Sequence, residues 1–421
     1  MRLSFLGGAQ EVGRSAVLVD TGTEKFLLDY GIKINVKPTD YPGEINTKLN
    51  AILLSHAHLD HCGAIPLLYN QHQNCPLCGL EITRPLIKML LYDSYKISKY
   101  ENEEEKFSKM SIGTTINHFK VVNYRKPFMI GKTRITFFDA GHIPGSAFIL
   151  LETQNKRILY TGDFNFSDTR LTKGADMDLP EVDVLITEST YSDREHPDRV
   201  KEERKMVESI QETLEKDGIA LVSCFAIARA QEILLVFDEY ELKYPIYMDG
   251  MSKKTTRVIN SYPEQLREYN CVEKAMKRLN VKFITNHSMR KRILKKPCII
   301  VTTSGMLTGG PIAHYIEKIY DREDSTLILT GFQVPGTEGA VLLETGRYIH
   351  QDLDLAVKMS VRKFDFSSHS SRTELFKFVK HVNPGKVFCV HGDNSKRFSQ
   401  ELREEYGFDT FSPSNGQNFD I

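Results

Sequence analysis

The sequence has 421 residues, which is enough for a large core and typical of two domains. Hydrophobic residues make up 41% and charged residues 26%, the ordinary balance of a soluble globular protein. Lys plus Arg and Asp plus Glu both number 55, so no overall basic field attracts nucleic acid, and an anionic substrate must be held by a local cleft.

Targeting and membrane segments are not expected. Residues 1–8 contain no apolar core of a signal peptide, and no stretch approaches the roughly 20 apolar residues of a membrane span. Five of the seven cysteines (Cys62, Cys224, Cys271, Cys298 and Cys389) are isolated in sequence. Because this is not a disulfide framework, we expect a reducing, cytoplasmic environment.

The N-terminal part predicts three short strands, over 3–6, 15–19 and 25–28, separated by glycine turns. Asp29 directly follows the third strand. It is expected either near the metal-binding loop described next or, equally, as an exposed turn residue.

A cluster of metal-binding residue types follows the apolar run 51–54, which predicts a buried strand. His56, His58, Asp60 and His61 lie in the loop that leaves this strand, where α/β sheets place their sites. Two His one residue apart can face one ion, while the Asp and the third His can reach a second. Imidazole and carboxylate ligands predict a catalytic zinc site, and this context disfavours a His-rich surface loop.

Cys75 and Cys78 form a CxxC pair, preceded by His72. A structural zinc site needs four ligands, and the chain supplies no second CxxC. Three alternatives remain open: His72 and another residue complete a metal site, two chains share the site in a homodimer, or the thiols are simply reduced.

The strand-to-ligand pattern then recurs along the chain. Predicted strands lead to a His or an acidic residue in each case: 133–139 to His142, 157–160 to Asp163, 182–187 to Glu188, 358–366 to His369 and 387–390 to His391. A lone residue of this kind is more often structural. Their succession indicates one site with more than one metal ion.

Between residues 193 and 357 helices alternate with short apolar strands, which indicates an α/β layer with parallel strands. Helices are predicted over 198–216 and 227–239, and strands over 219–223, 246–248, 298–302 and 325–330. After 302, a loop of small residues precedes Pro311, which can open a helix. Candidate phosphate contacts are Arg229, Lys253, Lys254, Ser304, Gly305, Gly309 and Gly310; salt bridges and a tight turn are the alternative.

Together these residues resemble the metallo-β-lactamase fold, and specifically its β-CASP nuclease branch. The HxHxDH stretch 56–61, His142 and Asp163 match the general motifs, and Glu188, His369 and His391 match those of the branch. Residues 225–232 and 304–306 are also similar. The likeness is to the endonuclease subunit of the cleavage and polyadenylation specificity factor and its archaeal and bacterial relatives, since DNA-repair members carry an aliphatic residue in place of His391.

The resemblance implies an α/β protein: an αββα sandwich built from residues 1–191 and 365–421, with an α/β β-CASP cap domain inserted at 192–364. We expect a minimal two-domain nuclease, without the N-terminal KH domains of one archaeal group or the C-terminal domain of ribonuclease J.

The resemblance also implies two zinc ions per chain. In this resemblance, one ion is held by His56, His58 and His142, and the other by Asp60, His61 and His391. Asp163 bridges both ions, and Asp60 is also expected to be a catalytic residue. The implied reaction is hydrolysis of single-stranded RNA to 5′-phosphate and 3′-hydroxyl ends, by endonuclease action, 5′-to-3′ exonuclease action or both. His369, which holds no metal, is the candidate proton donor, with Glu188 orienting it. Asp29 is expected to hydrogen-bond a ligand His.

Three other functions remain as alternatives. A small-molecule hydrolase of the same fold, such as a glyoxalase II-like thioesterase, would have a smaller cap. A DNA nuclease is disfavoured by His391. A non-catalytic subunit of an RNA-processing complex would be expected to have lost ligands, whereas every position is filled here.

Overall fold

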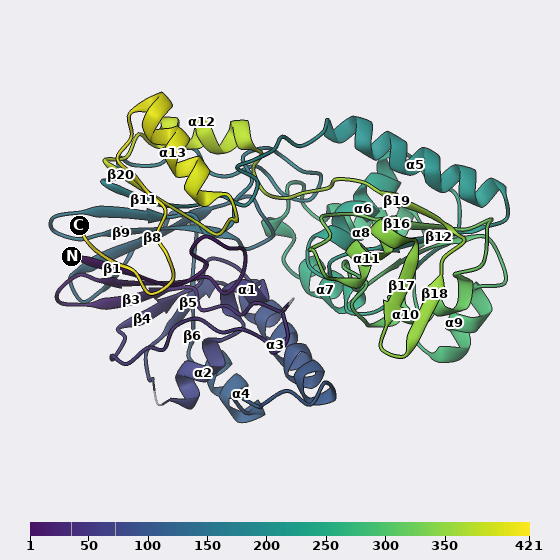
Figure 1. Ribbon diagram of the computed structural model, residues 1–421, viewed down its shortest axis with the longest axis horizontal. Coiled ribbons are helices and arrows are strands. Elements are labelled where there is room, and N and C mark those ends of the chain that lie inside the picture. The colour runs from purple at the N-terminus through teal and green to yellow at the C-terminus, as the bar shows by residue number, and fades with distance from the viewer. Residues whose placement is uncertain (35, 72) are drawn as a thin grey trace. The chain divides into compact units, whose positions relative to one another are not determined.

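The computed structural model describes residues 1–34, 36–71 and 73–421, so His72 lies outside the described residues. Contacts between residues divide the chain into two compact units (Figure 1). The first unit comprises Met1–Asp168, Gly174–Glu195 and Ser368–Ile421, and the second Thr169–Lys173 and His196–Ser367. The domain boundaries at 191/192 and 364/365 stay a prediction. None of the helices in the described part has the length and apolar character of a membrane span.

The first unit contains two seven-stranded sheets. The first sheet has the strand order β22 (Asn418–Asp420), β1 (Arg2–Gly7), β2 (Ala16–Asp20), β3 (Lys25–Leu28), β4 (Ala51–Leu53), β5 (Leu77–Leu80) and β6 (Phe119–Val122). The second has the order β21 (Thr410–Phe411), β20 (Lys386–Val390), β11 (Val184–Glu188), β10 (Arg157–Tyr160), β9 (Ala147–Glu152), β8 (Thr133–Asp139) and β7 (Phe128–Ile130).

A shared core joins the two sheets face to face. Alternate apolar residues of β1 and β3 pack with those of β8, β9 and β20 in one buried cluster, and the rings of Phe5 and Phe388 stack with centroids 5.3 Å apart. Because side chains alternate along a strand, the other residues of β9 and β20 face outward and are covered by α12 (Arg372–Val382) and α13 (Ser395–Tyr406). Helices α1 (Leu59–Cys62), α2 (Ile65–Asn70), α3 (Thr83–Tyr100) and α4 (Lys109–Asn117) accompany the first sheet (Figure 1).

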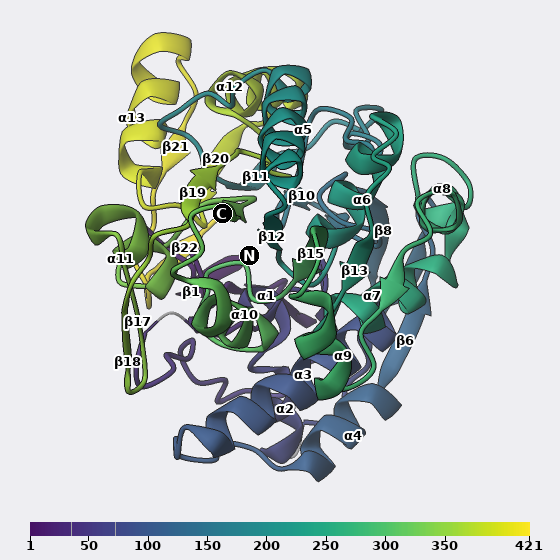
Figure 2. The same ribbon diagram turned by 90° about the vertical axis from the view of Figure 1, so that its right-hand side faces the viewer.

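The second unit is built on a six-stranded sheet whose paired strands all run parallel. Its order is β14 (Lys282–Phe283), β13 (Ile246–Met248), β15 (Cys298–Thr302), β12 (Ile219–Ser223), β16 (Thr326–Leu329) and β19 (Ser360–Lys363). A hairpin, β17 (Arg347–His350) and β18 (Leu353–Ala356), and seven helices complete it (Figure 2): α5 (Arg199–Glu215), α6 (Arg229–Glu239), α7 (Ser252–Asn260), α8 (Cys271–Arg278), α9 (His287–Ile293), α10 (Pro311–Ile319) and α11 (Glu338–Thr345).

Both faces of the central strands β15, β12 and β16 are buried, which explains why these strands are apolar without alternation. In β12, Ala220 and Val222 join a core with α5 and α6, while Ile219 and Leu221 join a second core with α10. The predicted parallel α/β layer and the predicted αββα sandwich with an inserted α/β domain are therefore confirmed.

One predicted element was wrong in its extent. The alternation over 358–366 predicted a strand that runs toward His369, but β19 ends at Lys363. Here the chain leaves the sheet of the second unit and enters the first unit at Ser368. His369 instead lies two residues before Ser371, which caps α12 in a capping box with Glu374.

Candidate metal centre

The candidate ligands come from loops and one short helix of the first unit. His56 and His58 lie between β4 and α1, and α1 carries Asp60 and His61. The remaining residues follow strands of the second sheet: His142 after β8, Asp163 after β10 and His391 directly after β20. Glu188 is the last residue of β11. Strands β10, β11 and β20 are parallel neighbours, so their carboxyl ends lie at one edge of the sheet.

These side chains converge into groups that could hold metal ions. The potential ligand atoms of His56, His58, His142 and Asp163 all lie within 4.8 Å of one another, as do those of Asp60, His61, Asp163 and His391. Asp163 belongs to both groups. They coincide with the two ligand sets that the family resemblance implied, and the role of each residue as a ligand stays a prediction.

Four of the His side chains use Nδ1 for contacts outside the centre. Nδ1 lies 2.7 Å from Asp29 Oδ2 in His61, 2.6 Å from Ser15 Oγ in His391, 2.7 Å from the Ser368 carbonyl in His142 and 3.0 Å from Ser55 Oγ in His56. Their Nε2 atoms remain for the centre. His58 is reversed, because its Nδ1 lies 3.1 Å from His56 Nε2 and 3.2 Å from His142 Nε2. Outer contacts of this kind fix the tautomer and orientation of metal-binding His.

Orphaned polar atoms show that a cation fits this pocket. Nε2 of His61, Nε2 of His391 and Oδ1 of Asp163 are buried without a hydrogen-bond partner. The Asp163 oxygen lies 3.3 Å from the first nitrogen and 3.5 Å from the second. An unsatisfied buried polar atom costs about 1–3 kcal/mol, so three that converge on one point favour an ion between them.

The protonation states of the three His in the first group also suit a cation. Burial lowers the pKa of His56 and His142 well below the ordinary value, and that of His58 below it, so these imidazoles are neutral and can donate a lone pair. Burial also acts against protonated His61, but Asp163 and Asp29 outweigh it and raise its pKa. Burial opposes ionisation of Asp163 as well, and His391 and His61 reverse this and hold its pKa well below the usual range.

Asp29 is fully buried, so the alternative of an exposed turn residue is wrong. Its carboxylate accepts hydrogen bonds from the Ser55 amide (2.7 Å), the Ser55 hydroxyl (2.6 Å), His61 Nδ1 (2.7 Å) and the Tyr160 hydroxyl (2.8 Å). Four donors fix this carboxylate and, through it, the ring of His61.

Ser15, which contacts two residues of the second candidate group, was not predicted as a site residue. Its hydroxyl lies 2.6 Å from His391 Nδ1, and its amide donates to the Asp60 carbonyl at 2.8 Å. A single serine in a predicted strand has no motif or spacing that would distinguish it. Ser55 and Tyr160 were missed for the same reason.

His369 and Glu188 form a pair beside these groups. His369 Nδ1 lies 3.0 Å and 3.2 Å from the two carboxylate oxygens, and Glu188 Oε1 also accepts from the Phe164 amide at 2.6 Å. The Glu188 side chain is fully buried, whereas that of His369 is 20% exposed. Burial alone would lower the pKa of His369, but the Glu188 carboxylate outweighs it and raises the pKa to about 9.

The candidate phosphate contacts lie in the second unit. Lys253 forms an ion pair with Asp249 at 3.0 Å, as the salt-bridge alternative expected, while Lys254 is exposed. Arg229 at the start of α6 is buried, and its Nε and Nη1 have no hydrogen-bond partner. Gly309 and Gly310 have φ values of 140° and 75°, which residues with a side chain rarely adopt, and they lead directly into α10. Ser304 and Gly305 belong to the same loop.

Cys75 and Cys78 are buried and free, as are the other five cysteines. Burial raises the pKa of the two thiols to about 11 and about 12 respectively, so they are protonated at neutral pH. Among the described residues, neither belongs to a group of potential metal ligands. His72 lies outside the described part, so a metal at this CxxC pair stays a prediction.

Comparison with known proteins identifies three family models along the chain. A metallo-beta-lactamase superfamily domain matches residues 16–189, a Beta-Casp domain residues 230–342 and a Zn-dependent metallo-hydrolase RNA specificity domain residues 354–413. A crystal structure of a protein of unknown function from Enterococcus faecalis superposes with a TM-score of 0.60 at 14% identity, covering 99% of each chain, which shows a shared fold.

Relatives match over nearly the whole chain. A protein named Probable RNase MJ4 from Methanocaldococcus jannaschii is 39% identical over 100% of both chains. RNase aCSPSF2 from Saccharolobus solfataricus is 33% identical over 100% of this chain and 85% of its own length. Transcription termination factor FttA from M. jannaschii is 32% identical over 99% of this chain and 71% of its own. The chain therefore belongs to the β-CASP ribonuclease family of metallo-hydrolases, within the metallo-β-lactamase superfamily.

Proposed function

We propose that this protein is a two-zinc ribonuclease that hydrolyses phosphodiester bonds in single-stranded RNA and leaves 5′-phosphate and 3′-hydroxyl ends. The observation that carries the proposal is the pair of ligand groups that share Asp163, with His369 and Glu188 beside them and within 4.8 Å of the same Asp163. The names of the relatives, two of them RNases, support RNA as the substrate.

In this proposal each of the two groups would hold one zinc ion, and Asp163 belongs to both groups. His56, His58 and His142 hold one ion, and Asp60, His61 and His391 hold the other. When bound, two such ions activate a water for attack and neutralise negative charge on the phosphate. The protein supplies neutral imidazoles at His56, His58 and His142. Hydrogen bonds from Asp29, Ser15, Ser55 and the Ser368 carbonyl hold the ligands in place before an ion arrives.

His369 acts as the proton donor to the departing ribose oxygen. Its Nδ1 donates to Glu188, which orients the ring, and we assign Nε2 to the substrate. The pKa of about 9 keeps the imidazole protonated at neutral pH. General acid catalysis of this kind contributes about 10²–10⁴-fold to the rate, and Glu188 serves to orient and charge the ring.

The remaining assignments extend the proposal to the second unit. Residues 192–364 form the β-CASP cap, and Arg229, Lys254 and the Ser304–Gly310 loop contact substrate phosphates. The loop follows the carboxyl end of β15, on the side of a parallel sheet where ligands usually bind. We further propose that the protein works in the cytoplasm, since all seven thiols are free.

The deciding experiment uses 5′-labelled and internally labelled single-stranded RNA, each with a matched DNA, against the wild type and His369→Ala. Metal content is measured on the same preparations. We expect RNA cleavage by the wild type and its loss in a variant that still holds zinc. Internal fragments would identify an endonuclease and mononucleotides a 5′-to-3′ exonuclease. A zinc-loaded wild type that cuts neither RNA nor DNA would overturn the proposal in favour of a small-molecule hydrolase or a non-catalytic subunit.

A further inference from the structure

Positive charge is concentrated in one segment of a chain whose net charge is zero. Residues 251–300 contain thirteen Lys and Arg but only three Asp and Glu, although the whole chain has 55 of each sign. The segment includes α7, α8, edge strand β14 and α9, all in the second unit. The chain as a whole has no net positive charge, but this segment provides a positive electrostatic field locally.

Four of these charges form one face of α9 and the turn after it. Lys291 and Arg292 lie in the last turn of α9, and Lys295 and Lys296 lie in the turn that directly follows it. All four are exposed, while Ile293 between them is buried in the core. The turn continues beyond the helix, since the amides of Lys295 and Lys296 donate to the carbonyls of Arg292 and Ile293.

In the part of the chain that the structure describes, no acidic side chain forms a salt bridge with these four cations. Within the described part of the chain, none of them takes part in an ion pair or a side-chain hydrogen bond. By contrast, Arg290 on the same helix binds Asp249 at 2.6 Å, and Lys253 and the Tyr315 hydroxyl contact the same carboxylate. Asp249 thus links α9 to the sheet through Arg290, whereas the four exposed cations form no ion pair in the described part of the chain.

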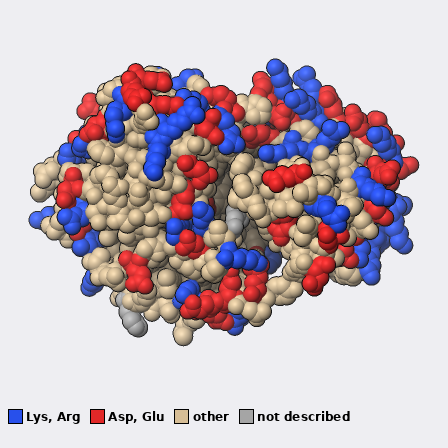
Figure 3. Space-filling model, viewed as in Figure 1, with Lys and Arg blue, Asp and Glu red and all other residues tan. Residues whose placement is uncertain are grey.

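The surface continues along the edge of the sheet. Lys282 is exposed on edge strand β14, and the guanidinium of Arg257 on α7 lies 5.0 Å from the ring of the next residue, Phe283. We define the α9 basic surface as Arg257, Lys282, Lys291, Arg292, Lys295 and Lys296. Lys and Arg side chains (blue) are frequent along the lower right margin of the second unit, around α9 (Figure 3).

Like charges that lie close together at the end of a helix and in the turn after it repel one another and do not stabilise the fold. This arrangement therefore weakens the fold slightly and gives nothing in return within the chain. A row of unpaired, flexible cations with a partly exposed aromatic ring is suited to a sugar–phosphate backbone, which it contacts without reading sequence.

We propose that the α9 basic surface binds the phosphate backbone of single-stranded RNA outside the catalytic centre. This inference rests on the proposed ribonuclease function and adds to it a second region of substrate contact. It makes the enzyme bind long RNA more tightly than short RNA, in a manner that depends on salt.

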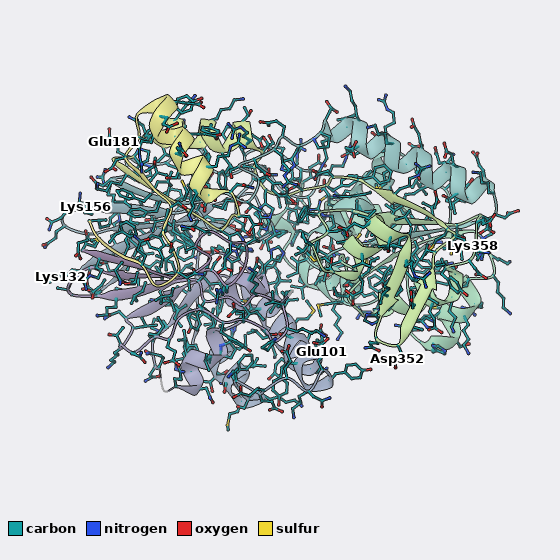
Figure 4. All side chains as sticks on the ribbon, viewed as in Figure 1. Glu101, Lys132, Lys156, Glu181, Asp352 and Lys358 are labelled. Carbon is teal, nitrogen blue, oxygen red and sulfur yellow. The ribbon has the colours of Figure 1, made fainter. Side chains whose placement is uncertain are left out.

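The test compares two fourfold Gln variants in a His369→Ala background, so that RNA stays intact. One carries Lys291→Gln, Arg292→Gln, Lys295→Gln and Lys296→Gln. The control removes the same charge from the first unit, with Lys48→Gln, Lys126→Gln, Lys132→Gln and Lys156→Gln, of which Lys132 and Lys156 are labelled in Figure 4. Binding of a fluorescent oligouridine and of polyglutamate is measured over a range of salt concentrations, with circular dichroism to verify folding.

We expect the α9 variant to bind oligouridine at least about tenfold more weakly in 0.1 M salt and the control to bind it as the parent does. Each phosphate contact on a single strand contributes about 0.7 to the slope of log affinity against log salt, so the slope should decrease by up to about 3. Equal losses in both variants, or none in either, would overturn the inference. So would an α9 effect on polyglutamate alone, which would indicate an acidic protein as the partner.

Failure of the inference is distinguishable from failure of the proposed function. The same substitutions in an otherwise wild-type, zinc-loaded chain should raise KM for long RNA and leave kcat and the cleavage of very short RNA unchanged. A chain that cleaves RNA with identical KM in both variants refutes only the basic surface. A chain that binds RNA through this surface but cleaves none refutes only the ribonuclease.

Discussion

Replacement of Glu188 by Gln tests the proton donor most directly. The Gln is isosteric, its carbonyl can still accept from the Phe164 amide, and only the charge beside His369 is lost. That charge outweighs burial and raises the pKa of His369 from the ordinary 6.5 to about 9. The difference corresponds to about 3 kcal/mol in favour of the protonated ring. Without Glu188, burial acts with less opposition, and the pKa should fall from about 9 toward 6.5.

The sign of the effect follows from the role of the residue. A proton donor is active below its pKa, so the rate falls as pH rises through that value, and Glu188→Gln should move this alkaline limb to lower pH. The pKa of His369 is measured by NMR of ¹³C-His-labelled, metal-free protein. The alkaline limb of the pH–rate profile is measured from kcat of the zinc-loaded enzyme at a series of pH values. Positive charge from zinc lowers the pKa in both proteins, so the difference between them is compared. Glu181→Gln, an exposed change of the same charge (Figure 4), is the control. Identical limbs in wild type and Glu188→Gln would refute the assignment.

Three further predictions concern the metal centre. His369→Ala should reduce cleavage by about 10²–10⁴-fold and retain both zinc ions, which metal analysis beside a cleavage assay would show; loss of zinc would make His369 a ligand instead. Ser15→Ala should lower the zinc affinity of the proposed site at Asp60, His61 and His391 by about 10–100-fold, because His391 loses its hydrogen bond to Ser15. Chelator titration should then show one weakened site and one unchanged site. Two unchanged sites would contradict the role of Ser15. Removal of zinc by a chelator should abolish cleavage and lower the melting temperature, because the buried atoms of His61, His391 and Asp163 that have no hydrogen-bond partner lose the ion between them. An unchanged melting temperature would argue against a metal bound among these residues.

Local patterns were sufficient for the elements nearest the centre. The apolar run 51–54 followed by His and Asp, and the same order before His142, Asp163 and His391, placed ligand types at strand ends because a buried strand needs apolar residues and its exit loop does not. The ends of β8, β10, β12 and β15 were predicted to the residue. Where both faces of a strand are covered, the local sequence is determined by local physics.

The tertiary structure decided what the sequence could not. Ser15 and Tyr160 are ordinary residues until the two sheets bring them against His391 and Asp29, at separations of 376 and 131 positions. The position of His369 depended on the chain leaving the second unit after β19, which strand alternation does not reveal. Arg290 and Lys291 are neighbours in a basic segment, and only the fold pairs the first with Asp249, 41 positions away, and leaves the second exposed. Contacts between distant segments depend on chain topology, so residue type and spacing alone do not specify them.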